Sequence, residues 1–236
     1  MTRVRLTFSK RGRACFIPHI ALPTIFSRAG NRAGIPFELS EGFTPRPRIS
    51  LGPELSVGVP ALFEPFEARL SFWNSALERR WNACLPEGFA LTGSVEITAL
   101  PGTPGAKALS KWCEAASCLL ALRRGIEGRE RIPECLENLL QKEELIFFEQ
   151  ASDLPEGFFR CIMKDPSRRG PGMLVKALAE AEVIRGWPEV FLLREAVGIL
   201  DTELLPSGSP RVLPLARSAD GAEDKTSLSA LEGEKQ

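Results

Sequence analysis

Two arginines stand in a proline-rich loop whose composition suits the binding of an anion. Within residues 40–52, Arg46 and Arg48 alternate with Pro45 and Pro47. Because proline fixes φ and lacks a backbone donor, Phe43–Arg48 cannot be a helix or a central strand, and a short apolar strand at Ile49–Leu51 follows. A stiff loop that presents charged side chains suits ligand binding, since its ordering entropy is already lost on folding. The alternative is a rigid connector whose arginines are only solvated.

Further arginines extend the predicted anion site. Arg28 and Arg32 are four residues apart, so they share one face of an expected helix. Together with the loop arginines they would bind phosphate groups in bidentate fashion. One alternative is a solvated helix face. Another is that Glu41 or Glu64 pairs with these arginines inside the protein, which would remove the anion site. The predicted substrate or anion site comprises Arg28, Arg32, Glu41, Arg46 and Arg48.

The charge distribution favours an anionic partner. The whole chain carries 30 Lys or Arg and 30 Asp or Glu, but residues 1–60 hold nine basic residues against three acidic ones. Positive charge gathered at one end is the expected footprint for RNA or a phosphate group. A solvated surface can show the same pattern by chance.

His19 is the single histidine and the candidate catalytic residue. Its ordinary pKa near 6.5 would suit a general acid or base. The alternative is a residue at the start of a helix that satisfies backbone groups. The residue two positions later is Ala21, so no neighbouring carboxylate orients the imidazole there, and the structural role is favoured.

The cysteines give no sign of a metal or cofactor. Six cysteines are scattered without a Cys-x-x-Cys pair, and one histidine is too few for the usual zinc combinations. We therefore predict no bound cofactor and no metal. The N-terminus reads as a strand rather than a secretory segment, and no apolar run reaches about 18 residues. We expect a reduced, cytoplasmic protein without a membrane partner.

Hydrophobic periodicity predicts an α+β fold. In the first half we expect strands at Val4–Phe8, Pro36–Ser40, Arg48–Leu51, Phe66–Phe72 and Phe89–Leu100, and helices at His19–Ala33 and Asn74–Leu85. In the second half we expect strands at Ala115–Leu122, Leu145–Glu149, Gly157–Met163 and Val190–Arg194, and helices at Pro133–Gln141 and Gly172–Glu182.

This order approximates β-α-β-β-α-β twice, so the sequence predicts two ferredoxin-like units packed together. The Pro/Gly-rich stretch at 101–108 is the expected linker. We assign residues 1–100 to the first unit, 109–205 to the second, and 206–236 to a disordered tail of polar and charged composition.

Several N-terminal motifs together resemble a known family. They are the strand Val4–Phe8 with Ser9–Gly12, the segment Phe16–Ile20, the segment Phe26–Pro36, the loop Ser40–Ser50, and Val57–Val59. Their order is similar to the radical-SAM-linked family, a domain of unknown function that occurs fused to cobalamin-binding radical SAM proteins or as a separate chain. The resemblance implies a radical SAM protein as the partner.

Three functions follow from these observations. The favoured one is an accessory module that works with a radical SAM partner and binds RNA or another anionic substrate, without catalytic activity of its own. The second is a metal-independent endoribonuclease-like enzyme that uses His19, by analogy with tandem ferredoxin-like enzymes. The third is a purely structural protein-interaction domain. Sparse catalytic groups beside a rigid basic loop favour the first.

Overall fold

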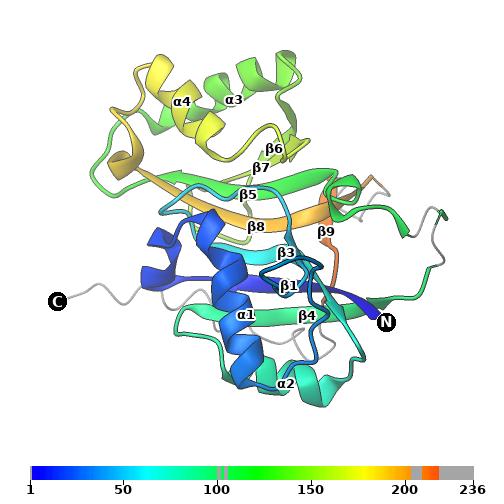
Figure 1. Ribbon diagram of the computed structural model, residues 1–236. Helices are drawn as coiled ribbons and strands as arrows, with labels where there is room; N and C mark the ends of the chain where they lie inside the picture. Colours follow the sequence, from blue (N-terminus) through cyan, green and yellow to red (C-terminus); the bar gives the residue numbers. More distant parts are fainter. Residues whose placement is uncertain (1, 100–101, 104–105, 203–208, 218–236) are drawn as a thin grey trace.

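One mixed β-sheet forms the centre of the molecule (Figure 1). The structure is a computed structural model that describes residues 2–99, 102–103, 106–202 and 209–217. Within these residues nine strands form the sheet and four α-helices pack against it, so the predicted α+β class is confirmed. No helix in the described part of the chain is long and apolar enough to cross a membrane.

The first half of the sheet places β1 between two antiparallel neighbours. Alternating Val4, Leu6 and Phe8 are buried in an aromatic core, where the rings of Phe26 and Phe66 stack 4.6 Å apart. The strands are β1 (Thr2–Lys10), β2 (Ile49–Leu51), β3 (Ala61–Leu70) and β4 (Phe89–Ile97), and the helices are α1 (Leu22–Arg32) and α2 (Ser75–Ala83).

The start of α1 and one expected strand differ from the prediction. The segment His19–Ala21 is a 3-10 turn, and the α-helix begins at Leu22. The predicted strand at Pro36–Ser40 is wrong, because only isolated pairs join Phe37 to Leu70 and Leu39 to Pro47. Since Pro36 and Pro47 have no backbone N–H, a regular ladder cannot continue there.

The second half continues the same sheet. Parallel pairing of β3 with β8 joins the halves, with Ala61 opposite Arg194 and Phe63 opposite Ala196. The sheet order is β4-β1-β3-β8-β5-β7-β6. The elements are β5 (Ala115–Leu122), α3 (Ile132–Gln141), β6 (Leu145–Gln150), β7 (Phe159–Lys164), α4 (Gly172–Glu180) and β8 (Val190–Asp201).

Part of the predicted disordered tail belongs to the fold. Residues Arg211–Pro214 form β9, which pairs antiparallel with the end of β8. Val212 is buried, and the hydroxyl of Thr7 donates to the carbonyl of Ala216 at 2.8 Å. The prediction of disorder is therefore wrong over 209–217, because four strand residues suffice to bury Val212 against the sheet. The rest of 206–236, and part of the expected linker 101–108, lie outside the described residues.

Candidate functional site

Hydrogen bonds close the arginine loop, which we define as residues 40–48. The backbone N–H of Ser40 donates to the carbonyl of Arg46 at 2.8 Å, and the N–H of Arg46 donates to the Ser40 hydroxyl at 3.1 Å. The N–H of Arg48 donates to the carbonyl of Glu38 at 3.0 Å. Gly42 has φ +117°, a conformation that favours glycine. These contacts hold the exposed Arg46 at a fixed place on the surface.

Next to this loop, three arginines stand side by side across neighbouring strands. Arg3 of β1 lies opposite Arg69 of β3, and the N–H of Arg69 donates to the carbonyl of Arg48 at 3.0 Å. Directly opposed residues share a face of an antiparallel ladder. Val4 and Leu6 point into the core under α1, so this arginine row (Arg3, Arg69 and Arg48) lies on the other face.

The arginine row is only partly neutralised. Arg3 donates to the Glu67 carboxylate at 2.7 Å. Arg48 lies 3.8 Å from the carboxylate of Glu41, which is 98 % exposed, so solvent screens that pair. Arg69 is exposed and forms no ion pair among the described residues. Like charges that stand directly opposite each other on a sheet repel and destabilise it. Because a bound anion would offset this repulsion, the arginine row favours anion binding on this face.

The structure brings together only part of the predicted anion site. Arg48 and Glu41 form the weak ion pair described above. Arg32 instead donates to the carbonyl of Cys84 at 2.7 Å, just after α2, and Arg28 is exposed on α1. Glu64, the other suggested partner of the arginines, binds Arg194 of β8. Arg3 and Arg69 were not predicted, since strand register cannot be read from the local sequence.

His19 lies beside a buried ionic cluster, defined here as Lys10, Glu64 and Arg194. Each of these residues is at most 2 % exposed. Arg194 donates to Glu64 at 2.6 Å and to the carbonyls of Glu54 and Pro53 at 2.9 and 3.0 Å. The Lys10 ammonium donates to the carbonyl of Ile17 at 2.6 Å. Two cations and one carboxylate leave the cluster with net positive charge.

The electrostatics of His19 follow from burial. Burial lowers the pKa of His19 below its ordinary value; nearby Glu64 opposes this shift and Arg194 adds to it. Burial likewise lowers the pKa of Lys10. The Nδ1 atom of His19 is buried and has no hydrogen-bond partner among the described residues. The lowered pKa favours the neutral form of this imidazole.

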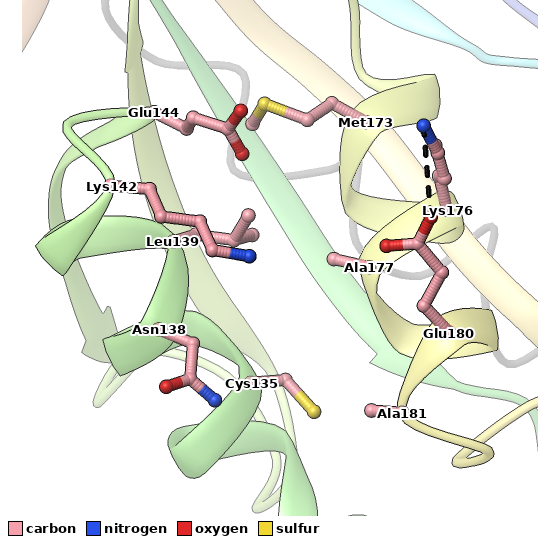
Figure 2. Close-up of a pocket in the computed structure, with 10 residues that line it drawn as sticks. All are labelled: Cys135, Asn138, Leu139, Lys142, Glu144, Met173, Lys176, Ala177, Glu180 and Ala181. Atoms are coloured by element: carbon pink, nitrogen blue, oxygen red, sulfur yellow. Dashed lines mark ion pairs between the residues drawn. The ribbon is translucent and has the colours of Figure 1, made fainter.

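A separate cleft lies between α3 and α4, and Figure 2 shows its lining. Its volume is about 490 Å³. The apolar side includes Leu139 and Met173, while Lys176 pairs with Glu180 across 3.6 Å at the rim. No predicted site residue lines this cleft. Among the described residues, no group of three or more His, Cys, Asp or Glu side chains could hold a metal ion.

Comparison with known proteins gives one family. A family profile described as "Uncharacterized protein conserved in bacteria (DUF2344)" matches residues 3–153, more than half of the chain. That description names no activity and no radical SAM partner, so this part of the resemblance stays a prediction. No curated protein matches the chain.

One solved structure found by the comparison is described as an unknown protein from Galdieria sulphuraria. It shares 13 % sequence identity with this chain, with a TM-score of 0.25, over 82 % of this chain and 98 % of that one. A likeness of this size supports no conclusion about fold or function.

Proposed function

This chain belongs to the DUF2344 family of uncharacterized proteins conserved in bacteria, and we propose that it is a binding module for RNA or another anionic substrate. The observation that carries the proposal is the pair of adjoining basic features, the arginine loop and the arginine row. Arg69 is unpaired within the described residues, Arg46 is exposed, and backbone hydrogen bonds hold both backbones in place. A pre-organised cationic surface loses little entropy when it binds.

In this proposal a radical SAM protein is the partner, and the module binds the substrate on which that partner acts. The support is the resemblance of the N-terminal motifs to the radical-SAM-linked family. Cytoplasmic location is part of the same proposal. Co-purification from cells, followed by identification of the bound proteins and nucleic acids, would test the partner directly.

The strand order also supports the finer fold assignment. In the first half β4-β1-β3 run antiparallel and β2 pairs with β3. In the second half the order β8-β5-β7-β6 has the same pattern of neighbours. This recurrence of β-α-β-β-α-β with equivalent pairing favours two ferredoxin-like units.

A second candidate is an endoribonuclease-like activity of His19. The observation that favours it is the unpartnered Nδ1 of His19, an imidazole whose lowered pKa favours the neutral form and whose neighbours include the buried Lys10. A proton acceptor next to a cation would suit attack of a ribose 2′-hydroxyl on its own phosphate. Incubation with RNA would distinguish the two functions: a binding module leaves RNA intact, while an enzyme cleaves it and loses cleavage in His19→Gln.

The test of the binding proposal is charge reversal at the loop. The double variant Arg46→Glu/Arg48→Glu should bind a fluorescein-labelled single-stranded RNA at least about tenfold more weakly, since two phosphate contacts become repulsive. The matched control is Arg124→Glu/Arg129→Glu, which changes the net charge equally in the second half. If both double variants lose affinity equally, binding follows net charge and the assigned surface is wrong. Absence of any RNA binding by the wild type would leave the structural protein-interaction domain as the better account.

A further inference from the structure

A second cleft lies next to the arginine row and is lined by two of its members, Arg3 and Arg69. Its volume is about 530 Å³, within the range of small-ligand sites. Its polar lining comprises two arginines, two glutamates and two threonines: Arg3, Arg69, Glu38, Glu96, Thr2 and Thr98. Phe37 pairs with Leu70, which places Glu38 opposite Arg69 and on the same face as the arginine row. The cleft therefore adjoins the surface proposed above to bind RNA.

One oxygen of the Glu38 carboxylate, Oε1, is buried without a hydrogen-bond partner among the described residues. Glu38 and Arg69 line the same cleft, yet the structure records no ion pair between them. An unsatisfied buried acceptor is costly, so Glu38 favours a ligand that brings N–H donors. The terminal torsion of glutamate is broad, so the carboxylate can turn its edge toward the cleft.

The Glu38 carboxylate and the Arg69 guanidinium thus belong to residues that line one ligand-sized space. Two carboxylate oxygens accept two parallel N–H donors. Guanine carries such a pair, N1–H and the 2-amino group, and its O6 and N7 are acceptors that an arginine contacts in bidentate fashion. Adenine and uracil each present a single N–H group beside an acceptor on that edge, so they would leave one carboxylate oxygen unpaired.

We propose that this cleft binds an unpaired guanine base of the RNA, with Glu38 on the N1–H and 2-amino edge and Arg69 on O6 and N7. The inference rests on the proposed RNA binding. Arg48 follows Arg69 in the arginine row and would contact the phosphate next to the bound base. Glu38 and Arg69 thus supply base selectivity, while Arg46 and Arg48 supply affinity that does not depend on sequence.

The test compares short uridine oligonucleotides that carry one central guanine, inosine or adenine. We expect the wild type to bind the guanine probe about tenfold more tightly than the adenine probe, with inosine in between because it lacks the 2-amino group. Glu38→Gln should remove this preference, because the guanine probe loses the carboxylate that accepts its N1–H and 2-amino donors. Glu87→Gln, an exposed glutamate elsewhere, is the matched control and should retain the preference.

The outcomes separate the two proposals. If the wild type binds all three probes equally, or if Glu38→Gln keeps the guanine preference, the guanine assignment is overturned while RNA binding stands. If no probe binds at any salt concentration, the proposed function itself fails. A thermal unfolding curve of Glu38→Gln that matches the wild type shows that a lost preference reflects the missing carboxylate rather than misfolding.

Discussion

At the scale of single residues, the charges fall into two groups with different consequences. Arg194 and Glu64 are fully desolvated, and Arg194 uses its guanidinium on one carboxylate and two carbonyls. Arg46 and Arg69 are exposed. The first group should therefore control stability, and the second should control binding with little effect on stability.

Removal of Arg194 should destabilise the fold strongly. Arg194→Met leaves Glu64 buried without its partner, and breaking a buried ion pair costs about 3–5 kcal/mol. Urea-induced unfolding followed by circular dichroism measures this change. Arg69→Met serves as the control and should change the free energy of unfolding by about 0.5 kcal/mol or less. Equal stability of the two variants would show that the buried pair is not needed for folding.

His19 should make stability depend on pH in a defined direction. Its pKa is lowered in the folded protein, so the unfolded chain binds more protons as the pH falls through about 6.5. The contribution of His19 to stability is present above that pH and is lost as the pH falls toward the lowered pKa. Because His19 is the only histidine, the His19→Gln variant isolates this effect.

The measurement is the free energy of unfolding between about pH 7.5 and pH 5.5. We expect the wild type to lose more stability over this interval than His19→Gln, with a slope difference below about 1.4 kcal/mol per pH unit, the limit for one proton. Parallel pH profiles of the two proteins would mean that the imidazole is as well solvated in the folded state as in the unfolded state.

The sequence predicted the loop residues of the candidate site but not the strand residues beside them. Arg46 and Arg48 were identified because two prolines mark a rigid loop. Glu38, Arg3 and Arg69 were not, since cross-strand neighbours are far apart in the chain. Arg194 and Glu64 are separated by 130 residues, so no local pattern could indicate that pair.

At the scale of elements, the prediction succeeded where one pattern dominates. The strand Ala115–Leu122 was predicted with its observed bounds, because a continuous apolar run with a turn on each side is typical of a buried strand. The end of β8 was missed: the strand was expected to stop at Arg194, but it continues to Asp201. A charged residue normally suggests an exposed position, whereas Arg194 is buried by its pairing with Glu64.

The strand β9 should contribute measurably to stability. Truncation after Thr202 removes the pairing with β8 and the burial of Val212. Full burial of one such side chain stabilises a fold by about 1.5–3 kcal/mol, so we expect a loss of at least about 2 kcal/mol. Truncation after Arg217 keeps β9 and is the control. A chain ending at Thr202 that is as stable as the one ending at Arg217 would contradict a structural role for β9.

At the scale of the whole molecule, contacts between the halves suggest one cooperative unit. The β3–β8 pairing makes the sheet continuous, and the Arg194–Glu64 pair crosses the same junction. Arg5 lies over the ring of Trp112 at 5.0 Å, and Arg3 donates to the carbonyl of Ala106 at 2.8 Å. Calorimetry should therefore show one transition whose calorimetric and van't Hoff enthalpies agree. Two resolved transitions would show that residues 1–100 and 109–205 unfold independently.

The central claim is that the arginine loop binds a polyanion. The most direct measurement is the salt dependence of single-stranded RNA affinity for the wild type and for Arg46→Glu/Arg48→Glu. Each phosphate contact contributes about 0.7 to the slope of log K against log salt, so the variant should have a slope shallower by about 1.4. An unchanged slope in the variant would contradict the claim, because the loop arginines would then make no contact with the RNA backbone.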